Sequence, residues 1–139
     1  MLGIPCLDLD SVFYDRFQID VADYIRDRGE QDFRQLEAVI LQELDLHFKT
    51  KHGDQALAIV ATGGGVILRQ ESRDILSSID AYTIWLDTEP EEIYRRIQLS
   101  QHPSFCGKPK AELKAEMLKR SCLYAEVADL KIRSVILVD

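Results

Sequence analysis

Short apolar runs alternate along this chain with longer stretches in which apolar residues recur at helical spacing. The clearest run covers residues 57–61, is partly β-branched, and leaves no position for a polar face. Such a run is typical of a strand that is covered by helices on both sides. The same pattern predicts strands at residues 4–7, 82–86 and 132–138. Strands that alternate with helices in this way imply an α/β fold, with a parallel sheet and helices on both of its faces.

Helices are predicted from the spacing of apolar residues and from residues that favour helix ends. Asp20 is a suitable N-cap for a helix over residues 21–28, which is followed by a longer helix over residues 30–47. Thr88 and Glu91 form a capping box, with Thr88 as the N-cap. The remaining helices are predicted over residues 69–79, 88–99 and 110–129.

Two arginines lie on or beside apolar helix faces. Arg34 lies next to the stripe that contains Phe33 and Ile40. An arginine there usually extends over the core toward water, and a role in a site is the less common alternative. Arg120 lies on the apolar stripe of the last helix itself. Burial of an unpaired guanidinium costs several kcal/mol, so Arg120 needs an anionic partner, either a carboxylate of the protein or one of a ligand.

Candidate site residues come directly after the first two predicted strands. Asp8 and Asp10 come at the end of the first strand, where period-two geometry places both on one face to hold a hydroxyl or a metal-bound water. The alternative is that Asp10 only caps a helix beginning at Ser11. The glycines at 63–65 end the second strand, and without Cβ atoms they can take positive φ and approach a ligand closely. A flexible turn is the alternative for these glycines.

Composition reduces the possible classes of partner and location. The 139 residues carry a net charge of -7, and 46% are hydrophobic, as in a globular protein. An acidic chain of this kind argues against nucleic acid as a partner. The three cysteines have no pairing pattern for disulfides or zinc, which favours a reducing compartment. No apolar run approaches the ~20 residues of a membrane span, and the first residues show no signal-peptide pattern.

Several segments together resemble the shikimate kinase family, a P-loop family related to the nucleoside-monophosphate kinases. They are IPCLDLD at 4–10, GEQDFRQLE at 29–37, TGGG at 62–65 and KRSCLYAEVAD at 119–129. They occur in the family's order and at compatible spacing, so the resemblance covers nearly the whole chain. The GE-x-x-FR and GGG elements together make it specific.

The resemblance implies transfer of the γ-phosphoryl group of ATP to the 3-hydroxyl of shikimate, with Mg²⁺ as cofactor, in the chorismate route to aromatic amino acids. It implies that Asp10 orients and deprotonates the hydroxyl, and that Asp8 helps to place Mg²⁺ through water. It also implies that Arg34 and Arg120 hold the shikimate carboxylate, which agrees with the need of Arg120 for an anion. The glycines that line the shikimate ring are Gly63, Gly64 and Gly65. The residues on the nucleotide side are one of Arg95 and Arg96, together with His102 in a lid loop over residues 100–109.

Two departures from the family pattern stand out. The 139 residues contain no G-x-x-x-x-G-K-[ST] phosphate loop, so we expect a single domain over residues 1–139 that is truncated at both ends and has no kinase turnover. His102 stands where the family usually has an arginine, and an ordinary loop residue is the alternative reading of it.

The competing functions are a non-catalytic binding or regulatory protein and a kinase for another small hydroxy acid such as gluconate. Arg34, Arg120 and Asp10 favour shikimate over the latter. The expected partners are shikimate and ATP, without nucleic acid or membrane. We expect a monomer when the protein is complete, located in the cytoplasm, or in a plastid if the source is a plant or alga.

Overall fold

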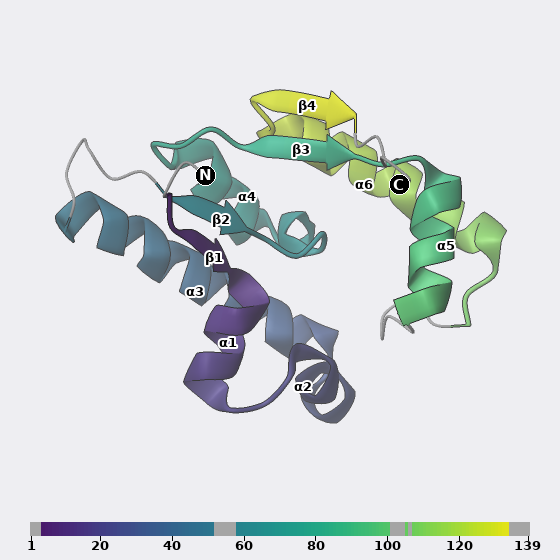
Figure 1. The fold of residues 1–139 in the computed structure, drawn as a ribbon, viewed down its shortest axis with the longest axis horizontal. Helices are drawn as coiled ribbons and strands as arrows, with labels where there is room; N and C mark the ends of the chain where they lie inside the picture. Colours follow the sequence, from purple (N-terminus) through teal and green to yellow (C-terminus); the bar gives the residue numbers. More distant parts are fainter. Residues whose placement is uncertain (1–3, 52–57, 101–104, 106, 134–139) are drawn as a thin grey trace. The chain divides into compact units, whose positions relative to one another are not determined.

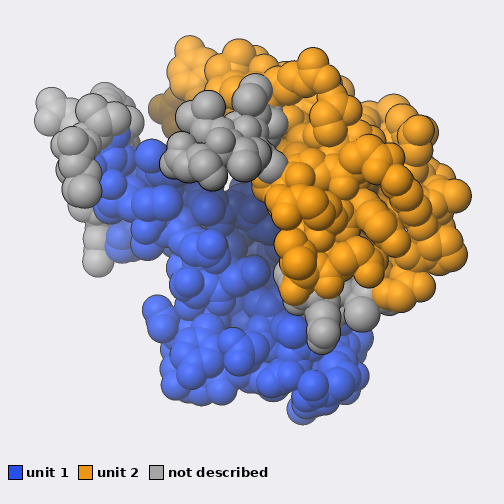
Figure 2. Space-filling view, turned by 45° about the vertical axis from the view of Figure 1, so that its right-hand side comes forward, with its two compact units in different colours: residues 1–79 blue, residues 80–139 orange. Residues whose placement is uncertain are grey.

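The computed structural model describes residues 4–51, 58–100, 105 and 107–133. They belong to two compact units, residues 1–79 and 80–139, which Figure 2 colours separately. Each unit contains one pair of parallel strands together with helices (Figure 1). The predicted α/β class with parallel strands is therefore confirmed. The single domain over residues 1–139 stays a prediction.

Unit 1 contains the strands β1 (Cys6–Asp8) and β2 (Ile59–Ala61), which pair in parallel so that Leu7 lies opposite Val60. The predicted cover of the β2 strand on both faces is wrong for its described residues, because Ile59 is 54% exposed and Ala61 is exposed as well. The remaining elements of unit 1 are α1 (Leu9–Phe17), α2 (Val21–Arg28), α3 (Glu30–Lys51), the 3-10 helix η2 (Val66–Leu68) and α4 (Gln70–Ser78).

The core of unit 1 is centred on the fully buried ring of Phe13 in α1. This ring lies 4.7 Å from that of Phe17 and 5.2 Å from those of Tyr24 in α2 and Phe33 in α3, measured between centroids. The contacts with Tyr24 and Phe33 are edge-to-face, an arrangement that adds to the free energy of burying the rings. They join α1 and α3, which carry the candidate site residues Asp10 and Arg34, to α2.

Unit 2 pairs β3 (Ile84–Asp87) with β4 (Leu130–Arg133) in parallel and contains α5 (Pro90–Ser100) and α6 (Lys110–Val127). Trp85 of β3 stacks on Tyr124 of α6 with the ring centroids 5.4 Å apart. Lys131 of β4 places its Nζ atom 4.1 Å from the centroid of the Trp85 ring. The predicted strand over residues 132–138 thus begins two residues earlier, and its part beyond Arg133 lies outside the described residues.

Two predicted helix ends need correction. The helix α3 continues to Lys51 rather than ending near residue 47. The helix α5 begins at Pro90, so Glu89 and not Thr88 occupies the N-cap position. The carbonyl of Glu89 accepts hydrogen bonds from the amides of Glu92 and Ile93 at 3.0 and 3.1 Å. Proline suits the first helical position because its φ is fixed and it has no N–H to satisfy. With Glu89 at the N-cap, Thr88 and Glu91 do not occupy the N-cap and N3 positions, so the predicted capping box is wrong.

Among the described residues, no helix is both long enough and apolar enough to cross a membrane.

Candidate functional site

The end of β1 places the first two candidate carboxylates at the start of α1. Oδ1 of Asp8 accepts hydrogen bonds from the amides of Asp10 at 2.8 Å and Ser11 at 3.2 Å, so Asp8 is the N-cap. Asp10 lies in the first turn of the helix. The prediction that both residues share one face of a strand is therefore wrong, and so is the alternative that Asp10 caps a helix beginning at Ser11. Asp10 instead projects from the first turn of α1, at the positive end of the helix dipole.

Arg34 of α3 is held by carboxylates of its own helix. Its Nη1 donates to both oxygens of Glu37 at 3.0 and 2.9 Å, and its Nη2 donates to Oε1 of Glu30 at 3.1 Å. The side chain of Arg34 is 11% exposed and that of Glu37 is 3% exposed. The pair is therefore nearly buried, and Arg34 does not extend into water as arginines beside a core usually do.

The glycine turn after β2 lies against this pair. A Cβ atom placed on Gly65 would lie 2.0 Å from Nη2 and 2.2 Å from Cζ of Arg34. A Cβ atom on Gly63 would lie 3.6 Å from Oε1 of Glu37 and 3.9 Å from Oδ1 of Asp10. Gly64 lies between them in the turn and is exposed. Unit 1 thus brings Asp10, Arg34 and the glycines together. Their role on the substrate side stays a prediction.

The expected reason for these glycines needs correction. Gly63, Gly64 and Gly65 are not among the glycines with positive φ, which in the described part of the chain are Gly29 and Gly107. At Gly65 the glycine is required because the guanidinium of Arg34 occupies the space that a side chain would fill.

Electrostatics at Glu37 reflect its burial. Burial raises the pKa of the Glu37 carboxyl above its ordinary value, and the nearby Asp10 and Glu30 raise it as well, while Arg34 acts in the opposite direction. The net direction is upward because desolvation disfavours the charged form of a carboxyl more than this ion pair favours it.

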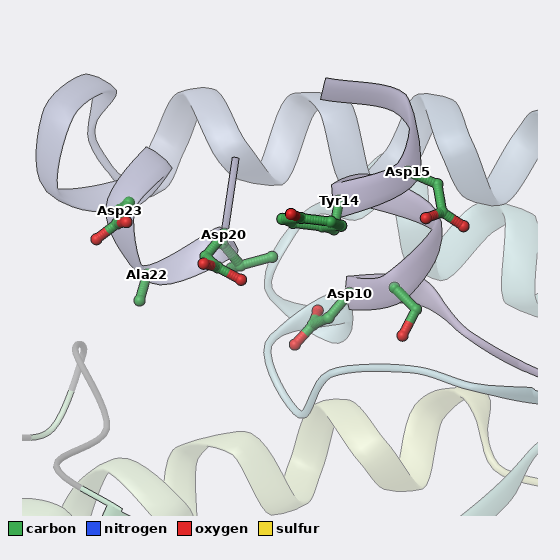
Figure 3. A pocket seen from close by; sticks show the side chains of 8 residues that line it. Asp10, Tyr14, Asp15, Asp20, Ala22 and Asp23 are labelled. Atoms are coloured by element: carbon green, nitrogen blue, oxygen red, sulfur yellow. The ribbon is translucent and has the colours of Figure 1, made fainter. Parts of the chain in front are cut away.

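An open cleft of about 600 Å³ lies beside this cluster in unit 1 (Figure 3). Asp10 and Tyr14 of α1 line it together with Asp20 and Asp23 at the start of α2. Asp10 therefore faces both the cleft and the glycine turn. The carboxylates around the cleft disfavour a bound anion there, whereas they can accept hydrogen bonds from hydroxyl groups.

In unit 2, Arg120 has partners within its own part of the chain. Its Nε donates to Oε1 of Glu116 at 3.0 Å, and its Cζ lies 4.8 Å from the centroid of the Phe105 ring. The side chain is 12% exposed. The predicted need for an anionic partner is thus met by a carboxylate of the protein, one turn earlier in α6. A contact with a ligand carboxylate stays a prediction.

The candidate nucleotide residues of α5 also share a carboxylate. Arg95 donates to both oxygens of Glu92 at 2.8 and 2.7 Å, and Arg96 donates to Oε1 at 2.7 Å. These hydrogen bonds lower the pKa of Glu92 to about 2. The side chain of Arg95 is 59% exposed and that of Arg96 is 50% exposed. Their role toward a nucleotide stays a prediction, and His102 lies outside the described residues.

The sequence analysis missed Glu37 and Glu116, the carboxylates that orient the two candidate substrate arginines. Glu37 comes three residues after Arg34, and Glu116 comes four residues before Arg120. Side chains at these spacings are neighbours on a helix surface. The signal was therefore present in the sequence as soon as the helices were assigned.

Comparison with known proteins places the chain in a family. The family model for shikimate kinase matches residues 1–137. The chain is 33% identical over 129 residues to shikimate kinase of Streptococcus thermophilus, which covers 91% of this chain and 75% of the relative. It is 35% identical over 136 residues to shikimate kinase of Streptococcus suis, covering 95% of this chain and 78% of the relative.

Solved structures agree with this assignment. A shikimate kinase from Acinetobacter baumannii in complex with shikimate superposes with a TM-score of 0.81 at 26% identity, over 97% of this chain and 72% of that one. A shikimate kinase from Bacteroides thetaiotaomicron gives a TM-score of 0.74 at 25% identity, over 99% and 76% of the two chains. No comparison favours a gluconate kinase or a non-catalytic protein. The chain belongs to the shikimate kinase family, whose members are ATP-dependent kinases that phosphorylate shikimate.

Proposed function

We propose that the Asp10, Arg34 and Gly65 cluster of unit 1 is the part of the chain that binds shikimate. The observation that supports this most directly is the guanidinium of Arg34, which lies against the backbone of Gly65 and is fixed by Glu37 and Glu30. A planar guanidinium in a fixed orientation is suited to a carboxylate, which it can bind through parallel N–H bonds. A ring carboxylate beside Arg34 would leave hydroxyl groups to face Asp10.

Arg120 is also proposed to bind the carboxylate of shikimate. The support comes from its place in the family motif and from its nearly buried position in unit 2. Its ion pair with Glu116 uses Nε, and a guanidinium has five N–H donors in all. A substrate carboxylate can therefore be added without breaking the pair with Glu116.

The proposed reaction assigns the proton to Asp10. The carboxylate of Asp10 accepts the proton of the 3-hydroxyl, the hydroxyl oxygen forms a bond to the γ-phosphorus of ATP, and the bond from that phosphorus to the β–γ bridging oxygen breaks to release ADP. General base help of this kind requires the carboxylate within hydrogen-bond reach of the hydroxyl. Arg95 or Arg96, together with His102, is proposed to contact the nucleotide.

Asp8 is the residue proposed to help hold Mg²⁺, and its chemistry fits. It is exposed, it offers the hard carboxylate oxygen that Mg²⁺ prefers, and its cap hydrogen bonds use only Oδ1. Oδ2 can therefore hold a water of the hydrated ion. When bound, Mg²⁺ neutralises charge that develops on the phosphate oxygens. No cluster of three or more metal-binding side chains occurs in the described ranges, so contact through one carboxylate and water is the form proposed.

Shikimate titration by calorimetry tests the proposed site. Arg34→Lys keeps the charge but loses the planar fork, and we expect it to weaken shikimate binding by about ten-fold or more. Arg28→Lys is the matched control, because Arg28 is exposed at the end of α2. Methyl shikimate, which lacks the ionised carboxylate, should bind weakly to wild type and lose little more in Arg34→Lys. Equal affinity of wild type and Arg34→Lys for shikimate would contradict the proposal.

The proposals for turnover, oligomeric state and cellular location have separate tests. An assay coupled to ADP release tests the expected lack of turnover by these 139 residues. A monomeric state can be checked by analytical ultracentrifugation, and a cytoplasmic location by cell fractionation.

A further inference from the structure

Phe105 lies against the candidate substrate arginine of unit 2. The centroid of its ring is 4.8 Å from Cζ of Arg120 and 5.5 Å from Nζ of Lys108. A cation at this distance from an aromatic face is attracted by the negative charge of the ring quadrupole. The ring is partly buried, so water does not fully screen this attraction.

The position of Phe105 is set by a turn and by one face of α6. The amide of Lys108 donates to the carbonyl of Phe105 at 3.2 Å, and Gly107 takes a φ of +77°, which glycine adopts without strain. Nζ of Lys108 lies 3.7 Å from Oε1 of Glu112. Glu112 and Arg120 are eight residues apart in α6 and so lie on similar sides of the helix, two turns from each other. The turn is thus attached to α6 at Glu112 through Lys108 and at Arg120 through Phe105.

Together these contacts engage Arg120 at two points. Glu116 engages Nε, while the Phe105 ring lies against the carbon centre of the guanidinium. We propose that Phe105 is a positioning residue, which acts with Glu116 to hold the Arg120 guanidinium in the orientation that binds the carboxylate of shikimate. This inference rests on the function proposed above for Arg120. A side chain that is ordered before binding loses less conformational entropy when the ligand arrives, so Phe105 raises affinity without touching the ligand.

Variants of Phe105 separate this role from simple packing. Phe105→Leu keeps an apolar side chain but removes the aromatic face, and we expect it to raise the Kd for shikimate about two- to five-fold in an NMR-detected titration of the full chain. Phe105→Tyr keeps the aromatic face and should bind shikimate within two-fold of wild type. A Kd for Phe105→Leu equal to that of wild type, or an equal loss in Phe105→Tyr, would overturn the inference.

A second measurement does not depend on shikimate. The Nε–Hε signal of Arg120, identified by its loss in Arg120→Lys, should carry a ring-current shift in wild type and in Phe105→Tyr. In Phe105→Leu it should move toward the position of an exposed arginine. A signal that stays in place in Phe105→Leu overturns the inference even if shikimate binds. A wild type that binds no shikimate overturns the proposed function, whatever the Arg120 signal does.

Discussion

Replacing Gly65 by alanine tests the contact that defines the candidate site in unit 1. The backbone of Gly65 has φ -92° and ψ -5°, which alanine can adopt, so the chain itself offers no obstacle. The obstacle is Arg34, because the new Cβ atom would lie 2.0 Å from Nη2 and 2.2 Å from Cζ. Non-bonded atoms of this kind rest about 3.5 Å apart, so the guanidinium must retreat by more than about 1 Å.

The retreat of Arg34 has a cost that follows from its partners. The guanidinium makes two hydrogen bonds to Glu37 and one to Glu30, and Glu37 is only 3% exposed. Complete loss of one partner of a buried ion pair costs about 3–5 kcal/mol. Because the cation is displaced and not removed, we expect Gly65→Ala to lower the free energy of unfolding by about 1.5–3 kcal/mol. For a chain of this size that corresponds to a Tm lower by roughly 6–12 °C.

Gly63→Ala is the matched control, since it lies in the same turn. Its Cβ atom would meet Oε1 of Glu37 at 3.6 Å and Oδ1 of Asp10 at 3.9 Å, which are ordinary contacts. Alanine there should be neutral or raise stability by up to about 1 kcal/mol, because it restricts the unfolded chain. Urea unfolding of both variants, followed by shikimate titration, gives the comparison. If Gly65→Ala is as stable as Gly63→Ala, the guanidinium of Arg34 does not lie where the structure places it.

Three further predictions concern single carboxylates. Asp8→Ala should lose about 1 kcal/mol of unfolding free energy, because α1 loses its cap, while Asp8→Ser keeps the cap and in a Mg²⁺ titration should show the weaker binding expected of a lost carboxylate. The pKa of Glu37 is raised in the folded state, so the stability of wild type relative to Glu37→Gln should fall as pH rises from 4.5 through the folded pKa. Urea unfolding between pH 4 and 8 measures this difference, which would not change with pH if the carboxyl were unperturbed. For Glu92, whose pKa is lowered to about 2, the stability advantage over Glu92→Gln should be present above pH 4.5 and disappear between pH 4.5 and 2; an advantage that persists at pH 2 would contradict the contacts with Arg95 and Arg96.

The fold could be predicted where both ends of an element carry local signals. The bounds of α2 match the prediction, with Asp20 at the N-cap position and Gly29, at φ +92°, after the last turn. The side chain of Asp20 makes no cap hydrogen bond, so the position of the residue and not its predicted contact is confirmed. The role of Asp8 could not be predicted in this way, since either aspartate of the DLD segment is a suitable cap. The choice is made by the pairing of β1 with β2, in which Asp8 lies opposite Ala61. The chain leaves the sheet at that point. A contact with a strand about fifty residues away cannot be predicted from the local pattern of apolar and polar residues.

In the candidate site, too, some features follow from local sequence signals and others depend on contacts between distant residues. The resemblance selected Asp10, Arg34 and the glycines, and unit 1 brings them together. The reason for glycine at position 65 is a contact with a side chain thirty-one residues earlier, which the sequence pattern does not contain. The partner of Arg120 is different, because Glu116 is a helical neighbour and the spacing alone indicates the pair.

Each candidate substrate arginine is oriented by residues close to it in the chain. Glu30, Arg34 and Glu37 all belong to α3, so forming that helix already brings the guanidinium to its carboxylates, and Gly65 adds the tertiary contact that fixes its place. Glu116 and Phe105 do the same for Arg120 within unit 2. A buried ion pair is weak evidence for stability, because desolvation offsets most of the attraction. The upward direction of the pKa of Glu37, with burial as its main cause, agrees with this. What the pair does supply is a fixed direction for the arginine. Under the function proposed above for Arg34, positioning of the substrate carboxylate is therefore a better physical reason for a buried glutamate at position 37 than stability of the fold.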